Sequence, residues 1–407
     1  MRVTRRLPVW LLGFANLPLG ITGAVALLIT PQVLAARHIP ETQISNITTL
    51  GLAGTLAFFV LAPVLDVRFS RRTYALVMTA GASLLTFVSV MSFQSPGLLG
   101  LWLFVALLIA NLNSSAIGGW FGSVFPPEYD APLGAWMTVA NTGGFGVTAI
   151  IGVLLVSHAS LWLAAITLAG LNVLPLLIIL AVEPPSQERR KAAESFGRFR
   201  TEVVELARRS EVRRLMMLFG LPCASFALTN TLGGLGADYG ASAGLIAAIA
   251  GVGLTLAGIL GSLSVPVLSR RASLMVVYLG IGIVGGLSTL SLLVLPRTPA
   301  VFTVAFVSQN VWQSASIATG FALTLSSIGK NNPLASTQFA ILIAALSAPI
   351  TYMQWIDGHA YGAGGLTALY LTDGGADLLA CGLMTFLFLC VWSGARAALA
   401  PQGASNQ

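Results

Sequence analysis

Apolar runs of about twenty residues recur from one end of the chain to the other, and they limit its fold more than any other feature. An α-helix rises about 1.5 Å per residue, so such a run matches the roughly 30 Å hydrocarbon core of a bilayer. Of the 407 residues, 56% are hydrophobic and only 9% are charged, whereas soluble domains carry roughly 25% charged residues. We expect an all-α polytopic membrane protein, because the strands of a β-barrel would be short and alternate in polarity.

Turn-forming residues between the runs divide the chain into twelve expected transmembrane helices. Pro126-Pro127 and Pro296-Arg297 are examples of this punctuation. The expected spans are 8–35, 44–66, 73–94, 98–122, 134–157, 160–182, 214–236, 243–267, 273–295, 300–326, 336–355 and 366–393. The first run has the basic start of a signal peptide, but its length and the many similar runs after it favour a retained helix.

The distribution of basic residues orients the chain with both termini in the cytoplasm. In that orientation 19 of the 21 Lys and Arg residues lie on the inner side, all except Arg37 and Arg297. Cytoplasmic loops of membrane proteins carry this excess of positive charge. The net charge of +7 is accounted for by the same bias, so no nucleic-acid partner is expected.

The longest polar segment, 183–213, separates two expected six-helix bundles, 1–182 and 214–395, and a cytoplasmic tail, 396–407, follows. Within the linker, Phe196, Phe199, Val203 and Leu206 recur at helical spacing, which predicts an amphipathic helix on the inner membrane face. A regulatory helix and a plain spacer both fit this pattern. Pro-Val-Leu followed by Arg-Arg occurs in 62–78 and again in 265–277, as two parallel repeats would place it.

Four short stretches carry a resemblance to a known family. Asp66, Arg71 and Arg72 are similar to the charged residues of the loop motif between the second and third helices of the major facilitator superfamily, although its glycines are missing. GFANLPLG (13–20), LAPVLD (61–66), FPPEYDAPLGAW (125–136) and ASTQFAILIAAL (335–346) resemble the AmpG-like muropeptide permeases, which are grouped with acetyl-CoA transporters.

This resemblance implies a function as well as a fold. It implies a secondary transporter that works by alternating access and imports a muropeptide-like amphipathic solute across a bacterial inner membrane. A siderophore or CoA-ester transporter of the same superfamily is the alternative, and a non-transporting membrane sensor on this scaffold is another. We expect a monomer that binds a small-molecule substrate, contacts the lipid bilayer and exchanges protons, as a symporter would.

Polar side chains inside the expected helices mark either helix contacts or a cavity. In the superfamily the first, fourth, seventh and tenth helices surround the central cavity, and the densest polar set lies in the tenth, 300–326. The expected substrate-binding residues are Asn16, Asn111, Asn113, Asn141, Asn230, Gln309, Asn310 and Gln313. Because no Lys or Arg lies in mid-membrane, a sugar-rich, amide-rich or zwitterionic cargo fits better than a phosphate-rich one.

A proton-coupled transporter usually carries the proton on a carboxyl group inside the membrane. Asp66 lies at the inner end of its helix, and Asp238, Asp357, Asp373 and Asp377 lie toward the outer end. Asp373 and Asp377 have apolar neighbours and are the expected proton-coupling residues. The three cysteines show no metal-binding spacing, so neither a metal nor a cofactor is expected.

The stretch NPLASTQFAILIAALSAPI (332–350) begins an apolar helix with polar residues. A helix start carries about half a positive charge, and in the superfamily the loop aspartate approaches this helix when the inner gate is shut. We therefore expect Asp66 to face the 334–338 turn. The expected gating residues are Asp66, Arg71, Arg72, Ser336, Thr337 and Gln338.

Two motif matches are typical of enzymes. Gly280, Gly282 and Gly285 match the dinucleotide fingerprint, but they lie inside an expected membrane helix, where small residues favour close packing. Ser242 lies in a Gly-x-Ser-x-Gly sequence like that of serine hydrolases. A hydrolase stays a third class of function, although no local Asp-His pattern supports it, and we do not expect an enzyme.

Overall fold

The computed structural model describes residues 7–182, 201, 203–206, 208–330 and 332–391, and the regular structure in these ranges is helical. The chain forms two compact units. Unit 1 comprises Met1–Pro127, Val139–Arg209 and Leu325–Ile341, and unit 2 comprises Glu128–Thr138, Ser210–Thr324 and Leu342–Gln407. Phe196 and Phe199 of the expected amphipathic helix lie outside the described residues, as does the tail after 391.

Unit 1 begins with a nearly unbroken helical segment. Its elements are α1 (Val9–Gly13), η1 (Phe14–Asn16), α2 (Leu17–Ala24), the π-helical turn η2 (Val25–Ile29) and α3 (Thr30–Ala36). Pro18 and Pro31 lie in the first turns of α2 and α3, where a missing backbone N–H is tolerated. The sequence therefore predicts the span correctly and misses its local changes of helix type.

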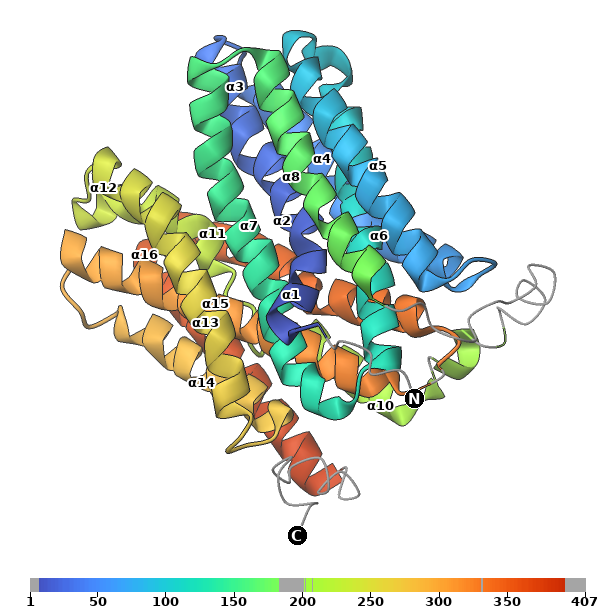
Figure 1. The fold of residues 1–407 in the computed structure, drawn as a ribbon. Helices are drawn as coiled ribbons and strands as arrows, with labels where there is room; N and C mark the ends of the chain where they lie inside the picture. Colours follow the sequence, from blue (N-terminus) through green and yellow to red (C-terminus); the bar gives the residue numbers. More distant parts are fainter. Residues whose placement is uncertain (1–6, 183–200, 202, 207, 331, 392–407) are drawn as a thin grey trace. The chain divides into compact units, whose positions relative to one another are not determined.

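Four long helices pack beside this segment and form the core of unit 1. The elements that follow are α4 (Glu41–Leu61), η3 (Ala62–Asp66), α5 (Arg71–Met91), α6 (Leu99–Val124), α7 (Asp130–His158) and α8 (Leu161–Ala181). α4, α5, α6 and α8 lie side by side (Figure 1). Leu34, Phe93, Leu103 and Leu168 are buried where they meet.

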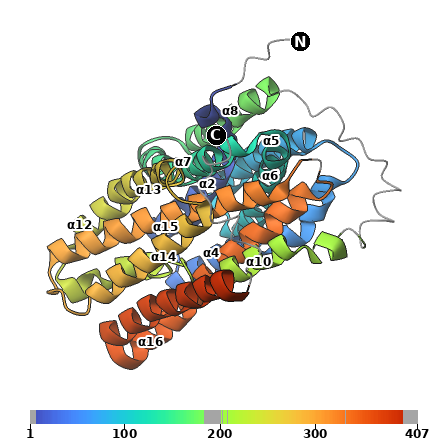
Figure 2. The same cartoon turned by 90° about the horizontal axis from the view of Figure 1, so that it is seen from below.

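Unit 2 contains the remaining helices except for the end of α15 and the start of α16, which belong to unit 1. Helices α13, α14 and α15 run alongside one another in both ribbon views (Figures 1 and 2). Its elements are α10 (Ser210–Gly220), α11 (Leu228–Leu232), η7 (Gly233–Tyr239), α12 (Ala243–Ala248), η8 (Ile249–Gly253), α13 (Leu254–Leu268), α14 (Leu274–Ser291), α15 (Pro299–Ile328), α16 (Ala335–Phe386) and η9 (Leu387–Val391).

The expected continuous helix 214–236 is wrong, because residues 221–227 interrupt it between α10 and α11. We call this segment the 221–227 break. Pro222 has no backbone N–H, and the residue before a proline avoids the α region, so the helix ends at Gly220. Phe226, within the break, has a left-handed φ of 48°.

The expected gap 356–365 is also wrong, since α16 continues through most of it. Non-helical backbone is confined to Gly364 and Gly365, and Gly365 has a φ of 61° that favours glycine. The eight residues from Ile356 to Ala363 are therefore helical. This extension places Asp357 inside an apolar helix.

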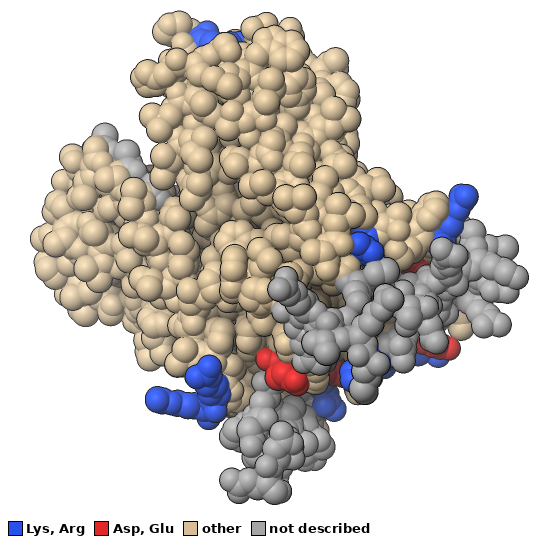
Figure 3. All heavy atoms as spheres, in the orientation of Figure 1, with Lys and Arg blue, Asp and Glu red and all other residues tan. Residues whose placement is uncertain are grey.

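The described helices have the surface of a membrane protein. Eight of them are long and apolar enough to cross a bilayer. Large apolar side chains are exposed along them, including Leu177, Val294 and Leu379. Most of the surface visible in Figure 3 carries neither basic nor acidic side chains, as expected for helices surrounded by lipid.

Candidate functional site

Asp66, Arg71, Ser336 and Thr337 form a buried network in unit 1, which we call the Asp66 cluster. The Asp66 carboxylate accepts hydrogen bonds from Arg71 Nε at 2.9 Å, from Ser336 N at 3.2 Å, and from Thr337 N and Oγ1 at 2.8 Å each. Backbone N–H groups in the first turn of a helix have no intrahelical partner and carry partial positive charge. The carboxylate satisfies two of them at the start of α16, so the expected contact with the 334–338 turn is present.

Arg71 extends the same network to the residues that precede α16. Its Nη2 donates to the carbonyl oxygens of Asn332 and Pro333, at 2.9 and 3.2 Å. Asn332 Nδ2 in turn donates to Gln338 Oε1 at 2.7 Å, and Gln338 Nε2 donates to the carbonyl of Ser327 at 2.9 Å. Arg71 therefore bonds to the start of the 332–338 turn, Asp66 bonds to its later residues, and the two side chains bond to each other.

Arg72, expected in the same group, lies apart from it. Its Nε and Nη2 donate to the carbonyl oxygens of Ile179 and Leu180, at 3.2 and 2.8 Å. These carbonyls belong to the last turn of α8, where backbone acceptors lack intrahelical donors. The contacts of Arg72 are those of a helix C-cap.

The four expected cargo residues of unit 1 have different surroundings. Asn113 Oδ1 accepts from Thr79 Oγ1 at 3.0 Å, which joins α6 to α5, while Asn111 Nδ2 donates to the Leu107 carbonyl of its own helix at 2.8 Å. Asn16 is buried in η1, and Asn141 is half-buried in α7. Protein partners thus use one polar group of Asn111 and one of Asn113.

Gln309 and Gln313 of α15 reach different neighbours in unit 2. Gln313 Nε2 donates to Thr229 Oγ1 at 2.7 Å and to the Phe226 carbonyl at 3.3 Å. Gln309 Nε2 donates to Thr289 Oγ1 at 2.8 Å, and its buried Oε1 has no hydrogen-bond partner among the described residues. Gln313 therefore contacts the 221–227 break and α11, and Gln309 contacts α14.

Asn310 and Asn230 complete the expected set. Asn310 is buried, and its Nδ2 donates to the Phe306 carbonyl one turn earlier in α15 at 2.8 Å. Asn230 of α11 is exposed and donates to Gln354 Oε1 at 3.2 Å. A ligand could therefore bond to the side-chain oxygen of Asn310 or to the exposed side of Asn230.

Three carboxyl groups of α16 are buried in unit 2, and we call Asp357, Asp373 and Asp377 the carboxyl cluster. Asp373 accepts from Thr289 Oγ1 at 3.3 Å and from the Leu228 backbone N–H. Asp377 accepts from Ser225 Oγ at 3.2 Å and from the same residue's N–H. Both expected proton-coupling residues are therefore held by the 221–227 break or by the first residue after it.

Asp357 is the residue of this cluster that the sequence did not select. It is 0% exposed and lies beside Asp373, and no donor of the described residues reaches either of its oxygens. The expected helix 336–355 ended eight residues before the turn at Gly364 and left Asp357 outside the span. Continuing that helix to the glycines at 364–365 would have indicated its burial.

The two enzyme-like motifs have structural explanations. A Cβ atom at Gly282 would lie 1.7 Å from the Cys223 carbonyl oxygen, so the glycines of α14 let the 221–227 break pack closely against that helix. Ser242 is the N-cap of α12, and its Oγ accepts from the Leu245 N–H at 3.2 Å. Gly282 and Gly285 serve packing against this segment, and Ser242 serves a helix start.

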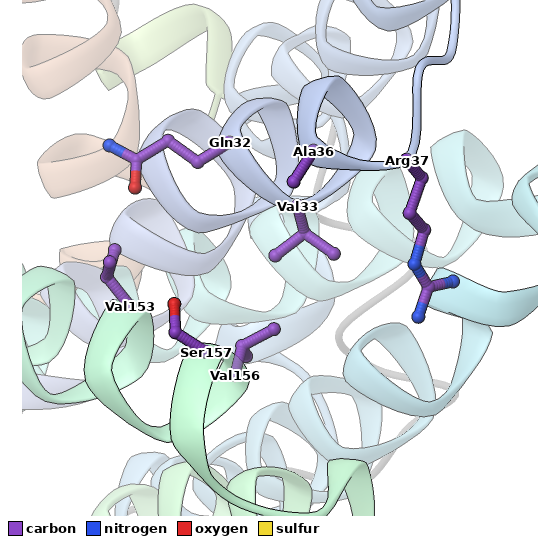
Figure 4. Close-up of a pocket in the computed structure, with 7 residues that line it drawn as sticks. All are labelled: Gln32, Val33, Ala36, Arg37, Val153, Val156 and Ser157. Carbon is purple, nitrogen blue, oxygen red and sulfur yellow. The ribbon is translucent and has the colours of Figure 1, made fainter.

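A cavity of about 190 Å³ lies in unit 1 between the end of α3 and the end of α7. Figure 4 shows its lining residues, Gln32, Val33, Ala36, Arg37, Val153, Val156 and Ser157. Arg37 also donates a hydrogen bond to the Phe93 carbonyl. None of the expected cargo residues lines this cavity, so it gives no support to a cargo site there.

Comparison with known proteins identifies the family. The model of the Major Facilitator Superfamily matches residues 12–352. The fucose:proton symporter FucP of E. coli is similar in structure, with a TM-score of 0.72 and 14% identity over 94% of this chain and 99% of that chain. The human organic anion transporter MFSD10 gives a TM-score of 0.66 and 16% identity over 92% and 98% of the two chains.

A bacterial homologue of the iron transporter ferroportin gives a TM-score of 0.66 and 16% identity, over 95% of this chain and 100% of that chain. No curated protein matches the sequence. At these identities the solved structures show the fold alone, whereas the family model covers most of the chain. The protein belongs to the Major Facilitator Superfamily, and it is a multi-pass membrane transporter of small molecules rather than an enzyme.

Proposed function

We propose that the protein is a secondary active transporter that imports a small amphipathic, muropeptide-like solute across the bacterial inner membrane by alternating access. The proposal includes twelve transmembrane helices in two six-helix bundles, 1–182 and 214–395, joined by the linker 183–213. Both termini would be cytoplasmic, because 19 of 21 basic residues then lie on the inner side. A monomer would suffice, since one chain supplies both bundles.

The Asp66 cluster is the observation that carries the alternating-access proposal. Leu325–Ile341 comes from the second half of the chain, yet it packs within unit 1. Asp66 and Arg71, from the first half, bond to backbone groups on both sides of the turn in this segment. Opening the cytoplasmic side would require these bonds to break, so the cluster would stabilise the state in which that side is closed.

The cargo class follows from the chemistry of the candidate binding residues. Gln309, Gln313, Asn230 and Asn310 offer amides, and Thr229 offers a hydroxyl. Neutral donors and acceptors of this kind suit sugars and peptide bonds. The four stretches that resemble the AmpG-like permeases support a muropeptide, which contains both groups.

We also propose that Asp373 and Asp377 take part in proton coupling, so that the transporter is a symporter. Both are 1% exposed, and a carboxyl buried at membrane depth is a typical proton carrier. The structurally similar FucP is named as a proton symporter. Coupled import would allow accumulation of the solute against its gradient.

A thermal-shift screen of the purified protein against muropeptides, siderophores and CoA esters tests the cargo class. A muropeptide should raise the unfolding temperature, and Gln309→Ala and Gln313→Ala should abolish the rise. A shift with siderophores or CoA esters instead would favour the alternative cargoes of the same superfamily. A sensor would bind its ligand without moving labelled solute in proteoliposomes.

A further inference from the structure

We propose that the carboxyl cluster is the coupling-ion site, that Asp357 and Asp373 share the transported proton, and that the 221–227 break links this site to Gln313. The inference rests on the proposed transport function. It adds the acceptor pair and the route by which its charge acts on a candidate cargo residue. Every contact in the argument lies within unit 2.

The first step concerns the charge that this cluster can hold. Asp357, Asp373 and Asp377 are at most 1% exposed, and no Lys, Arg or His of the described residues forms an ion pair with them. Removing one carboxylate from water without a cation costs several kcal/mol. Three adjacent buried charges would therefore not be stable, and the cluster must bind protons or another cation.

The other titratable groups near the cluster do not supply that cation. Cys223, Cys381, Tyr278 and Tyr352 interact with Asp377 or with one another. Their neutral forms carry no charge, and their ionised forms are negative. Asp373 is the titratable neighbour of Asp357. The cluster is thus surrounded by groups that cannot neutralise a carboxylate.

The second step concerns which carboxyl carries the proton. Asp373 receives hydrogen bonds from Thr289 and Leu228, and Asp377 receives them from Ser225. Such donors stabilise the charged form of a carboxyl group. Asp357 has no donor within the described residues, so it is the proton-bearing partner and can donate that proton to Asp373.

An independent observation extends this site toward the candidate cargo residues. Gln309 is 1% exposed, and its Oε1 accepts no hydrogen bond from any described residue. Its Nε2 donates to Thr289 Oγ1, which donates to Asp373. A buried, unpartnered acceptor thus lies at the end of a hydrogen-bonded series that runs from Asp373 through Thr289 to α15, where a ligand donor could bind.

The 221–227 break connects the two sites. Ser225 and Leu228 donate to the carboxyl cluster, while the carbonyl of Phe226 and the hydroxyl of Thr229 accept from Gln313. Four of the five residues from 225 to 229 therefore contact either the proton site or a candidate cargo site. Interrupted helices in secondary transporters supply such ion and substrate contacts.

Backbone strain makes this segment a suitable link. Phe226 is buried with a left-handed φ of 48°, a conformation that is strained in a non-glycine residue. Its carbonyl accepts from the N–H and the hydroxyl of Thr229 as well as from the Gln313 amide. A change of charge on Asp373 or Asp377 alters the bonds that hold the neighbouring N–H groups, and so alters the partner of Gln313.

Infrared difference spectroscopy of the purified protein across a pH change tests proton binding without a cargo. The wild type should show the band of a protonated carboxyl that disappears as the pH rises, and Asp357→Asn should lack it. Asp238→Asn removes an exposed carboxyl that bonds Tyr361, and it should keep the band. Thr289→Val should shift the frequency of the band, since Asp373 loses a donor.

Three results would overturn the assignment. The first is an unchanged band in folded Asp357→Asn, and the second is an unchanged frequency in Thr289→Val. The third is loss of the band on adding Na⁺ at constant pH, which would make an alkali cation the occupant. If Asp357→Asn does not fold, Asp357→Glu serves the same test, because it keeps the proton and should shift the band.

Transport separates this inference from the function on which it rests. In proteoliposomes Asp357→Asn should keep exchange of labelled muropeptide and lose at least tenfold in uptake driven by a proton gradient. Equal gradient-driven uptake in the variant and the wild type would overturn the proton role of Asp357. A wild type that neither exchanges nor accumulates any solute would contradict the proposed function, whatever the infrared result.

Discussion

Replacing Asp66 with Asn tests the proposed cytoplasmic gate. Four hydrogen bonds end on the two carboxylate oxygens, two on each: Arg71 Nε and Ser336 N on Oδ1, and Thr337 N and Oγ1 on Oδ2. An asparagine has one oxygen, and its NH₂ group can face Thr337, whose hydroxyl can turn to accept a hydrogen bond but whose backbone N–H cannot. The variant therefore loses the bond from the Thr337 N–H, together with the charge that strengthens the other bonds and attracts Arg71.

A hydrogen bond to a charged group contributes roughly 1.5–3 kcal/mol and one between neutral groups about 1 kcal/mol, so losing one bond and removing the charge from the others costs the closed state about 3 kcal/mol. A difference of 1.4 kcal/mol changes an equilibrium about tenfold. The ratio of open to closed molecules should therefore rise on the order of 100-fold. Asp66→Asn should shift the population toward the state whose cytoplasmic side is open.

Labelling of a cysteine placed at Leu334 measures this shift. Leu334 is 3% exposed beside the Asp66 cluster, so a maleimide should react slowly in the closed state. With the exposed Cys390 replaced by serine, Asp66→Asn should raise the labelling rate at least tenfold. Asp238→Asn should leave it unchanged. An equal rate in folded Asp66→Asn and in the parent would refute the gating role of Asp66.

Three further predictions follow from other contacts. Gln313→Ala should weaken cargo binding about tenfold in the thermal-shift titration, the effect of one lost hydrogen bond. The control variant Asn172→Ala removes a buried amide bonded to Thr86 and should lower stability only. Equal cargo affinities in Gln313→Ala and the parent would contradict the proposed cargo site. Gly282→Ala should lower the free energy of unfolding by about 1–3 kcal/mol, because its Cβ would overlap the Cys223 carbonyl. A Cβ at Gly280 would meet nothing within 4 Å, so Gly280→Ala should be neutral. Matching unfolding temperatures of the two variants would refute the packing role of Gly282. Arg72→Ala should destabilise the protein by about 1 kcal/mol without changing the labelling of Leu334→Cys, since the partners of Arg72 are carbonyls of α8. Faster maleimide labelling in this variant would show that Arg72 contributes to the gate.

Much of the helical framework could be predicted because each span is encoded by a run of apolar residues. The errors fall where one residue decides the backbone within such a run. Pro222 lies among apolar residues, so hydropathy shows no interruption, although the proline ends α10. Farther along unit 2, the expected spans leave 356–365 as a gap, whereas the structure departs from a helix only at Gly364 and Gly365.

A candidate site could be predicted from the sequence where both partners of a contact are recognisable in it. Asp66 and the polar turn before α16 each stand out, and helix electrostatics explains why they meet. Asp357 was not selected because its burial depends on where α16 turns, and Thr289 looks like any threonine in an apolar helix. The link through Ser225 and Leu228 depends on the 221–227 break, which no periodicity in the sequence indicates.

Uptake of radiolabelled muropeptide into proteoliposomes that contain the purified protein tests the central claim most directly. With an inward proton gradient, the solute should accumulate above its external concentration, and an ionophore that dissipates the gradient should release the excess. Liposomes without protein should show neither effect. Saturable binding of the muropeptide with no movement across the bilayer, with or without the gradient, would contradict the account and favour a membrane sensor.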